Sequence, residues 1–237
     1  MEATGLSKRQ TDIKKQIDMR IFAIADPHGN YSFIKDLLEK AGNVDAVLIA
    51  GDITNFGPSE KALELIGMFS QKVMAVPGNC DPLSTMEILD NSSVSLHNKL
   101  ETFGGITFVG FGGSNPTPFC TPFEIEECDI GEKLEKLMSD AQEYKQPIVL
   151  LTHAPPYGVL DAVRDTHVGC RPLAKYLGKV SLVVCGHIHE ARGVEEHDGT
   201  IVVNPGMAAA GFAALIHIND PDDPTDGTKI NAMLIKA

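Results

Sequence analysis

Short apolar runs alternate with amphipathic segments along the first 90 residues, and this alternation restricts the fold more than any other feature of the chain. Residues 21–25 are all apolar, as in a strand that is covered on both faces. Residues 31–41 carry their apolar side chains at helical spacing. The same order recurs twice, with strands and helices expected at 44–50, 59–71, 73–76 and 83–89. Such an order predicts right-handed crossovers and a parallel sheet.

The rest of the chain adds strands that follow one another more directly. Gly104-Gly105 separates the segments 99–103 and 106–111 and predicts a hairpin. Helices are expected at 130–144 and 171–177. Further strands are expected at 99–103, 106–111, 148–151, 182–185, 193–196, 200–203, 212–218 and 229–235, with an acidic loop at 220–227 before the last. We therefore predict an α/β domain at 20–237, with two mixed sheets packed face to face and helices outside, after an N-terminal extension at 1–19.

Five polar segments each follow an apolar run that we interpret as a buried strand. These segments are Asp26-Pro27-His28, Gly51-Asp52, Gly78-Asn79-Cys80-Asp81, Thr152-His153-Ala154 and Gly186-His187-Ile188-His189. Ligands of open α/β sheets bind at the carboxyl ends of the strands. Carboxylate, imidazole and amide oxygen are ligands of hard or borderline divalent cations, and one carboxylate can bridge two ions. The pattern therefore predicts a two-metal hydrolytic site.

Each segment also has an ordinary explanation when it is taken alone. Asp26 could cap the helix that follows it, and a Gly-Asp pair after a strand is usually a turn. Most isolated histidines are surface or satisfied core residues. The other four histidines, at 97, 167, 197 and 217, do not follow strands in this way. Among them, His97 and His167 are candidates for groups that surround the ligands.

Composition limits the partners and the compartment. The net charge of −12 argues against attraction to nucleic acid or to an anionic membrane, although bound divalent cations would make the site itself attract phosphate. The five cysteines show no paired spacing, which favours reduced thiols in a cytoplasmic protein. Residues 1–20 lack the apolar core of a signal peptide, and no run of about 18 apolar residues could span a membrane.

Taken in order, the five segments resemble the motifs of the calcineurin-like metallophosphoesterase superfamily. The resemblance implies a four-layer α/β/β/α sandwich of two mixed β-sheets flanked by helices, with a dinuclear centre. It implies seven metal ligands: Asp26, His28, Asp52, Asn79, His153, His187 and His189. Asp52 would bridge, with Asp26, His28 and His189 on one ion and Asn79, His153 and His187 on the other. The catalytic groups implied are Asp52, Asn79 and His153, and the ligand set admits Mn, Fe, Zn, Ni or Co.

Position 80 departs from most of the superfamily, which carries Gly-Asn-His-Asp/Glu there. That histidine is thought to protonate the leaving group or to hold the phosphate, whereas a thiol is a weak donor. Losing a general acid typically lowers the rate by about 10²–10⁴-fold. The Gly-Asn-Cys-Asp form resembles a branch of small bacterial and archaeal phosphodiesterases, which favours phosphodiesters or activated esters as substrates. Cys80 could equally fill space beside the metals, and Asp81 loses the obvious partner that a histidine at position 80 would provide.

Two turn-rich segments, 112–121 and 155–165, are expected to form the rim of the pocket. Candidate substrate contacts are Cys80 and the cations Arg164, Arg171 and Arg192. An organic leaving group could face Phe119, Phe123 and Tyr157.

Four functions fit this pattern to different degrees. A metal-dependent phosphodiesterase acting on a small phosphate ester fits best. A phosphomonoesterase or protein phosphatase would use the same chemistry. A non-catalytic interaction scaffold would resemble the phosphoesterase-like subunit of retromer, but it would not need seven intact ligands. Nuclease activity is disfavoured by the acidic charge, and a homo-oligomer formed through the N-terminal extension is left open.

Overall fold

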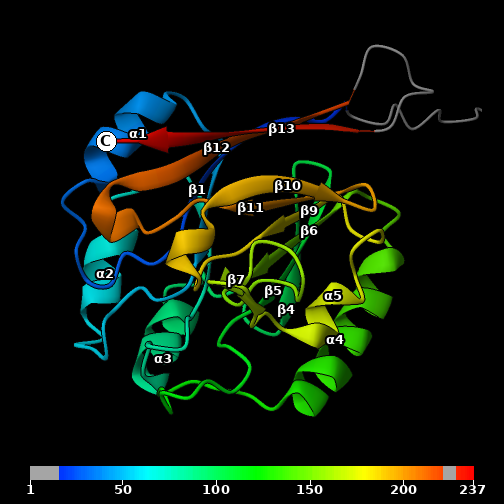
Figure 1. Cartoon of the computed structure of the whole chain (residues 1–237). Coiled ribbons are helices and arrows are strands. Elements are labelled where there is room, and N and C mark those ends of the chain that lie inside the picture. Colours follow the sequence, from blue (N-terminus) through cyan, green and yellow to red (C-terminus); the bar gives the residue numbers. More distant parts are fainter. Residues whose placement is uncertain (1–15, 221–227) are drawn as a thin grey trace, which may run out of the picture.

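Two mixed β-sheets pack face to face and carry helices on their outer sides, as Figure 1 shows for this computed structural model. The structure describes residues 16–220 and 228–237. The layers follow the order helix, sheet, sheet, helix, which confirms the predicted four-layer α/β/β/α sandwich. One apolar cluster fills the space between the sheets, and two others lie between each sheet and its helices.

The first sheet has the strand order β13-β12-β1-β2-β3. Its strands are β1 (Asp18–Ile24), β2 (Ala46–Ala50), β3 (Lys72–Val76), β12 (Phe212–Asn219) and β13 (Lys229–Lys236). The first three are parallel, and β12 and β13 are added antiparallel. Alternate residues of β1 face opposite layers, since Ile21 packs between the sheets and Phe22 packs against the helices. The helices on this side are α1 (Ile34–Ala41), α2 (Lys61–Ile66) and α3 (Leu83–Asn91).

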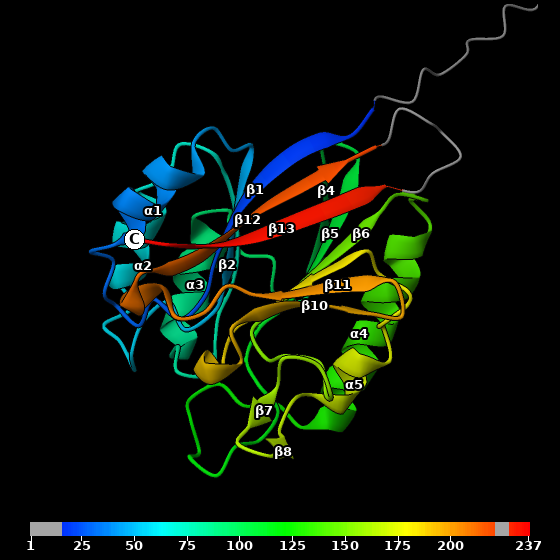
Figure 2. The same cartoon turned by 45° about the horizontal axis from the view of Figure 1, so that its top comes forward.

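The second sheet has the order β10-β11-β9-β6-β5-β4. Its strands are β4 (Lys99–Phe103), β5 (Ile106–Phe111), β6 (Ile148–Thr152), β9 (Leu182–Val184), β10 (Gly193–His197) and β11 (Thr200–Asn204). The four central strands are parallel to one another, and the edge strands β10 and β4 each pair antiparallel with their neighbour. Helices α4 (Glu127–Gln142) and α5 (Arg171–Ala174) cover its outer side. A small hairpin of β7 (Ala162–Val163) and β8 (Thr166–His167) stands apart from both sheets (Figure 2).

Several boundaries differ from the sequence predictions. Helix α2 is shorter than the expected 59–71, because Gly67 lowers helix propensity and the chain continues in tighter turns. Helix α4 begins at Glu127, three residues before the expected start, and the hairpin of β7 and β8 was not expected. Strand β1 begins at Asp18, ahead of the expected domain start, and Ile17 is buried against the turn between β4 and β5. The rest of the expected extension, 1–15, and most of the expected acidic loop, 221–227, lie outside the described residues.

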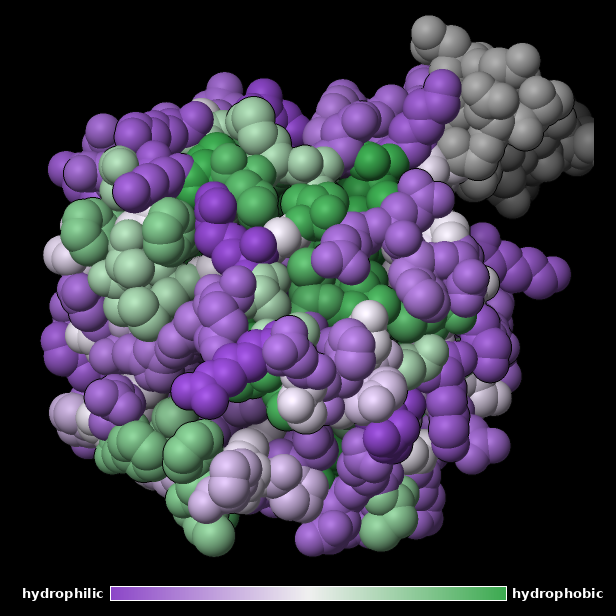
Figure 3. All heavy atoms as spheres, in the orientation of Figure 1, coloured by the Kyte–Doolittle hydropathy of each residue, from purple (hydrophilic) through white to green (hydrophobic). Residues whose placement is uncertain are grey.

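Strand β13 forms an edge of the first sheet and crosses the face drawn in Figure 3. Hydrophobic side chains gather along it within a largely hydrophilic surface, and Met233 is 57% exposed.

Among the helices within residues 16–220 and 228–237, none has the length and apolar composition needed to span a membrane. The expected homo-oligomer stays a prediction.

Candidate metal centre

The carboxyl ends of five parallel strands meet at one edge of the sandwich, where the two sheets are joined by hydrogen bonds. His153, after β6, donates from Nδ1 to the carbonyl oxygen of Ala50 at the end of β2, at 2.8 Å. Gly186 donates its backbone N–H to the carbonyl oxygen of His153, at 2.9 Å. The backbone N–H of His187 donates to the Asp26 carboxylate after β1, at 3.1 Å. These bonds fix loops from both sheets around one point.

Two glycines allow this close approach. A Cβ atom at Gly78 would lie 2.1 Å from both the backbone nitrogen and Oδ1 of Asp52, and one at Gly186 would lie 2.7 Å from Oδ2 of Asp26. Any larger residue at either position must therefore displace a carboxylate that we predict to be a ligand.

We expect Gly78→Ala to weaken metal binding. The added methyl group must push Asp52 away, and second-sphere changes at metal sites typically lower affinity by about 10–100-fold. Titration of chelated protein with Mn²⁺, followed by calorimetry, measures this loss. Gly131→Ala is the matched control, because a Cβ atom there would meet only Pro172 at 3.9 Å. Equal Mn²⁺ affinity in the two variants would contradict the prediction.

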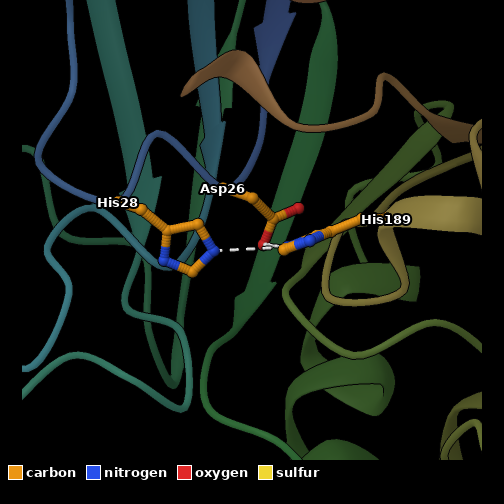
Figure 4. A group of neighbouring side chains, drawn as sticks. All are labelled: Asp26, His28 and His189. Atoms are coloured by element: carbon orange, nitrogen blue, oxygen red, sulfur yellow. Dashed lines mark hydrogen bonds and ion pairs between the residues drawn. The ribbon is translucent and has the colours of Figure 1, made fainter. Parts of the chain in front are cut away.

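One group of ligand atoms comes from Asp26, His28 and His189, drawn in Figure 4. The two rings and the carboxylate point toward one another, with 3.2 Å between the Nε2 atoms of His28 and His189. Nε2 of His189 lies 3.6 Å from Oδ1 of Asp26. Two imidazoles and a buried carboxylate converging in this way match the donors that borderline divalent cations prefer.

A second group comes from Asp26, Asp52 and His153, whose ligand atoms lie within 4.8 Å of one another. Asn79 adds its Oδ1 atom, 2.8 Å from Nε2 of His153. The amide is oriented by Thr121, which accepts a hydrogen bond from Nδ2 at 2.9 Å and donates its own hydroxyl to Glu124.

Nε2 of His153 and Oδ1 of Asn79 face each other, and their hydrogen-bonding character indicates which kind of atom can bind between them. Because Nδ1 of His153 donates to a carbonyl oxygen, a neutral ring presents a lone pair at Nε2. Oδ1 of Asn79 also presents lone pairs, so the two acceptors at 2.8 Å require a proton or a cation between them. The donor set therefore fits a metal ion.

Asp52 belongs to the second group and also lies beside His28 of the first. Its Oδ1 atom is 3.4 Å from Nε2 of His153, and its Oδ2 atom is 3.8 Å from Nε2 of His28. Each carboxylate oxygen thus faces one group, which fits the bridging role that the resemblance implies. The seventh predicted ligand, His187, lies at the same edge, and its ring contacts that of His153 edge to face with 5.0 Å between centroids.

Several of the predicted ligands have strained backbone conformations. Four of the seven predicted ligands are non-glycine residues in the left-handed region, with φ of 54° at Asp26, 46° at His28, 49° at Asp52 and 69° at His187. Each such residue costs about 1–3 kcal/mol and persists only where its surroundings hold it. Backbone hydrogen bonds from Asp26 to Gly51 and from His28 to Asp52 provide that support. Strain of this kind is typical of functional sites.

The electrostatics keep two of these imidazoles, His28 and His187, neutral. Burial lowers the pKa of His28, and burial together with the nearby His153 lowers the pKa of His187 to about 4. Although burial alone would raise the pKa of Asp26, its hydrogen bond to His189 and the neighbouring histidines lower it. His189 is the exception, since that same interaction with Asp26 raises its pKa. Neutral imidazole and ionised carboxylate are the forms that bind metal.

The third motif differs from its expected surroundings. Asp81 does not lack a partner: its carboxylate accepts hydrogen bonds from the backbone N–H groups of Ile53, Thr54 and Gly78 and from the Thr54 hydroxyl. Burial and the charge of Asp52 raise its pKa to about 6. Burial and Asp52 likewise raise the pKa of the Cys80 thiol, so Cys80 presents a protonated sulfur beside His28 and Asp52. Through its hydrogen bonds to Ile53, Thr54 and Gly78, Asp81 joins the loop after β2 to the loop after β3.

A cavity of about 820 Å³ adjoins the ligand groups and includes His187 in its lining. Phe119, Tyr157 and Arg171 also line it, with the Arg171 guanidinium 3.9 Å from the centroid of the Tyr157 ring. The two expected rim segments both contribute to this lining, at 115–119 and at Tyr157 and Val163.

Three expected contacts do not reach this cavity. Arg164 is exposed in the turn between β7 and β8 and does not belong to the lining formed by the described residues. Arg192 donates instead to the carbonyl oxygens of Pro205 and Ile235. Phe123 packs edge to face against His97. This geometry gives no support to phosphate binding by Arg164 or Arg192.

Sequence reasoning missed the residues that support the ligands from loops. Thr121 and Glu124 orient Asn79, and His97 accepts a hydrogen bond from the backbone of Gly112 instead of contacting a ligand. No spacing signal marks Thr121 or Glu124, because both lie in a segment of turn formers far from Asn79 in the chain.

Comparisons with known proteins agree with this geometry. The family model described as calcineurin-like phosphoesterase matches residues 19–191. An uncharacterized protein of Methanocaldococcus jannaschii is 35% identical over 198 residues, which cover 79% of this chain and 88% of that protein. A UPF0046 protein of Caenorhabditis elegans is 29% identical over 210 residues, covering 75% and 69% of the two chains.

Solved structures share the fold. The protein TT1561 of Thermus thermophilus gives a TM-score of 0.65 at 17% identity, over 90% of this chain and 98% of its own. A dimetal phosphatase from Danio rerio gives a TM-score of 0.64 at 11% identity, over 92% and 98%.

Proposed function

Because this chain belongs to the calcineurin-like phosphoesterase family, we propose that it hydrolyses a small phosphodiester or activated phosphate ester at a dinuclear metal centre. The position of Asp52 carries the proposal. One of its oxygens faces His153 and the other faces His28, so a single carboxylate can serve both groups. Paired ligand groups that share a carboxylate are typical of two-metal phosphoryl transfer.

The predicted ligands form two sets, one for each metal ion. Asp26, His28 and His189 would hold one ion, and Asn79, His153 and His187 the other, with Asp52 between them. Two bound divalent cations would supply positive charge for the phosphoryl oxygens and lower the pKa of water. The chain holds its ligands in place before substrate binds, since Thr121 orients Asn79 and Ala50 orients His153. Such preorganisation is the main protein contribution to phosphoryl transfer.

Preference for a diester rests on the charge of the cavity. Glu126, Glu127 and Glu190 line the cavity beside the site, where Arg171 is the cation among the described lining residues. This balance favours a substrate with one negative charge over a monoester with two. The protonated thiol of Cys80 is a weak hydrogen-bond donor, so an ester with a poor leaving group needs a proton from another residue.

We expect chelated protein reloaded with Mn²⁺, Ni²⁺ or Zn²⁺ to hydrolyse bis-p-nitrophenyl phosphate faster than p-nitrophenyl phosphate. Release of p-nitrophenol measures both rates, and chelated protein without added metal is the control. Cleavage of the monoester alone would replace this proposal with a phosphatase. No turnover with two ions bound would leave the interaction-scaffold hypothesis.

A further inference from the structure

A histidine and a buried aspartate form a second polar pair outside the predicted ligands. Asp161 is 1% exposed, and its Oδ1 atom accepts a hydrogen bond from Nδ1 of His167 at 2.5 Å. Its Oδ2 atom accepts from the backbone N–H groups of Gly158 and Gly169, each at 2.9 Å. Both oxygens of the carboxylate therefore accept hydrogen bonds from within the loop at 155–170.

This loop is built to hold the pair. Cys170 and Pro155 are joined by a backbone hydrogen bond, and Ala162 pairs with His167 across the β7 and β8 hairpin. A Cβ atom at Gly169 would lie 2.8 Å from Oδ2 of Asp161, so the backbone closes directly over the carboxylate. The His167 ring in turn packs against Tyr157, with 5.6 Å between centroids.

Asp161 fixes the chemistry of the His167 ring. A carboxylate only accepts hydrogen bonds, so Nδ1 of His167 must carry its proton toward Asp161. Nε2 is then the ring nitrogen left to give or take a proton, and Asp161 holds the ring in that orientation. The side chain of His167 is 49% exposed, so that Nε2 is accessible while Asp161 is not.

His167 is placed to reach a bound ester. It lines the same 820 Å³ cavity as His187, which belongs to the predicted ligands. Strand β7 packs beside the 3-10 turn η1 (His189–Ala191), which begins at another predicted ligand, as both cartoon views show. Tyr157 and Phe119 line this cavity too and offer apolar surface to an organic leaving group.

We propose that His167, oriented by Asp161, protonates the leaving group and so does the work that Cys80 cannot do. This inference rests on the proposed phosphoesterase function. Hydrolysis forms a bond from a water oxygen to phosphorus and breaks the bond from phosphorus to the leaving oxygen. The electron pair of the broken bond stays on that oxygen, which takes the proton from Nε2 of His167. The proton released by the water restores His167. Asp161 acts as a positioning residue.

The test compares two diesters that differ in how much their leaving groups need a proton. With Mn²⁺ loaded, we expect His167→Gln to lower kcat/KM for diphenyl phosphate by about 10²-fold or more. For bis-p-nitrophenyl phosphate, whose leaving group is stable as an anion, the change should stay within about threefold. Asp161→Asn should shift the two rates in the same unequal way, because it replaces the carboxylate that fixes which ring nitrogen of His167 carries a proton.

His197→Gln is the matched control, since His197 is also exposed and also lies beside an aspartate, in the distant β10. It should leave both rates unchanged, and the Mn²⁺ content of all proteins should be equal. Equal losses on both diesters, or no loss on either, would overturn the inference. Absence of turnover by the unmodified protein would overturn the proposed function itself, and the inference with it.

Discussion

Asp52→Asn is expected to abolish most metal-dependent turnover, lowering kcat/KM by about 10³-fold or more. Asp52 faces both ligand groups, so its loss weakens the hold on both ions at once. A metal ion supplies several kcal/mol of transition-state stabilisation, and each 1.36 kcal/mol corresponds to a factor of ten. Steady-state hydrolysis of bis-p-nitrophenyl phosphate, with metal content measured on the same samples, gives both quantities.

The same substitution should raise the stability of the metal-free protein. Asp26 and Asp52 are both buried and their ligand atoms lie in one group, so removing one charge relieves repulsion. Asparagine keeps an oxygen for the backbone N–H of Cys80, which donates to Oδ1 of Asp52 at 2.8 Å, and it tolerates the positive φ of 49°. A gain in stability together with a loss of activity is the usual sign of a functional site.

Asp198→Asn is the matched control for Asp52→Asn. Asp198 has a similar positive φ of 51° but lies in the exposed turn between β10 and β11. It should change neither metal content nor turnover. Retention of two ions and of full activity by Asp52→Asn would contradict the bridging role.

The sequence predicted the strands and the polar segments at their ends because both depend on short-range periodicity. A fully apolar run such as residues 21–25 can only be a buried strand when helices alternate with it, and parallel strands must bring Asp26 and Asp52 to one edge. The layers and the ligand groups therefore followed from local patterns and from the resemblance.

The supporting residues could not be predicted because they act across loops. Thr121 reaches Asn79 from 42 residues away, and nothing in its own segment marks that contact. The partners of Asp81 are backbone groups, which carry no sequence signal. The sequence marked His167 as a candidate near the ligands but did not show its partner, because the bond to Asp161 forms only when the loop closes and Gly158 and Gly169 donate to the same carboxylate.

Addition of Mn²⁺ to chelated protein is expected to raise Tm by about 10 °C. A ligand that binds only the folded state at 1,000 times its Kd adds about 4 kcal/mol, and about 2–4 °C accompany each kcal/mol in a chain of this size. The reason lies in Asp26, Asp52 and the facing acceptors of His153 and Asn79, which are buried without a cation between them. Thermal scans with Mn²⁺ and with excess chelator measure the shift.

The dependence of this stabilisation on pH and on Asp52 separates a specific site from general binding of cations to an acidic protein. His189 must lose its proton to bind metal, and Asp26 raises the pKa of His189, so the Mn²⁺-induced shift should shrink as the pH falls through that raised value. Asp52→Asn should lose most of the shift, whereas Asp198→Asn should keep it. A shift of equal size in both variants would mean that Mn²⁺ stabilises the chain through its surface charge, and that the converging side chains at the strand ends do not bind the ions.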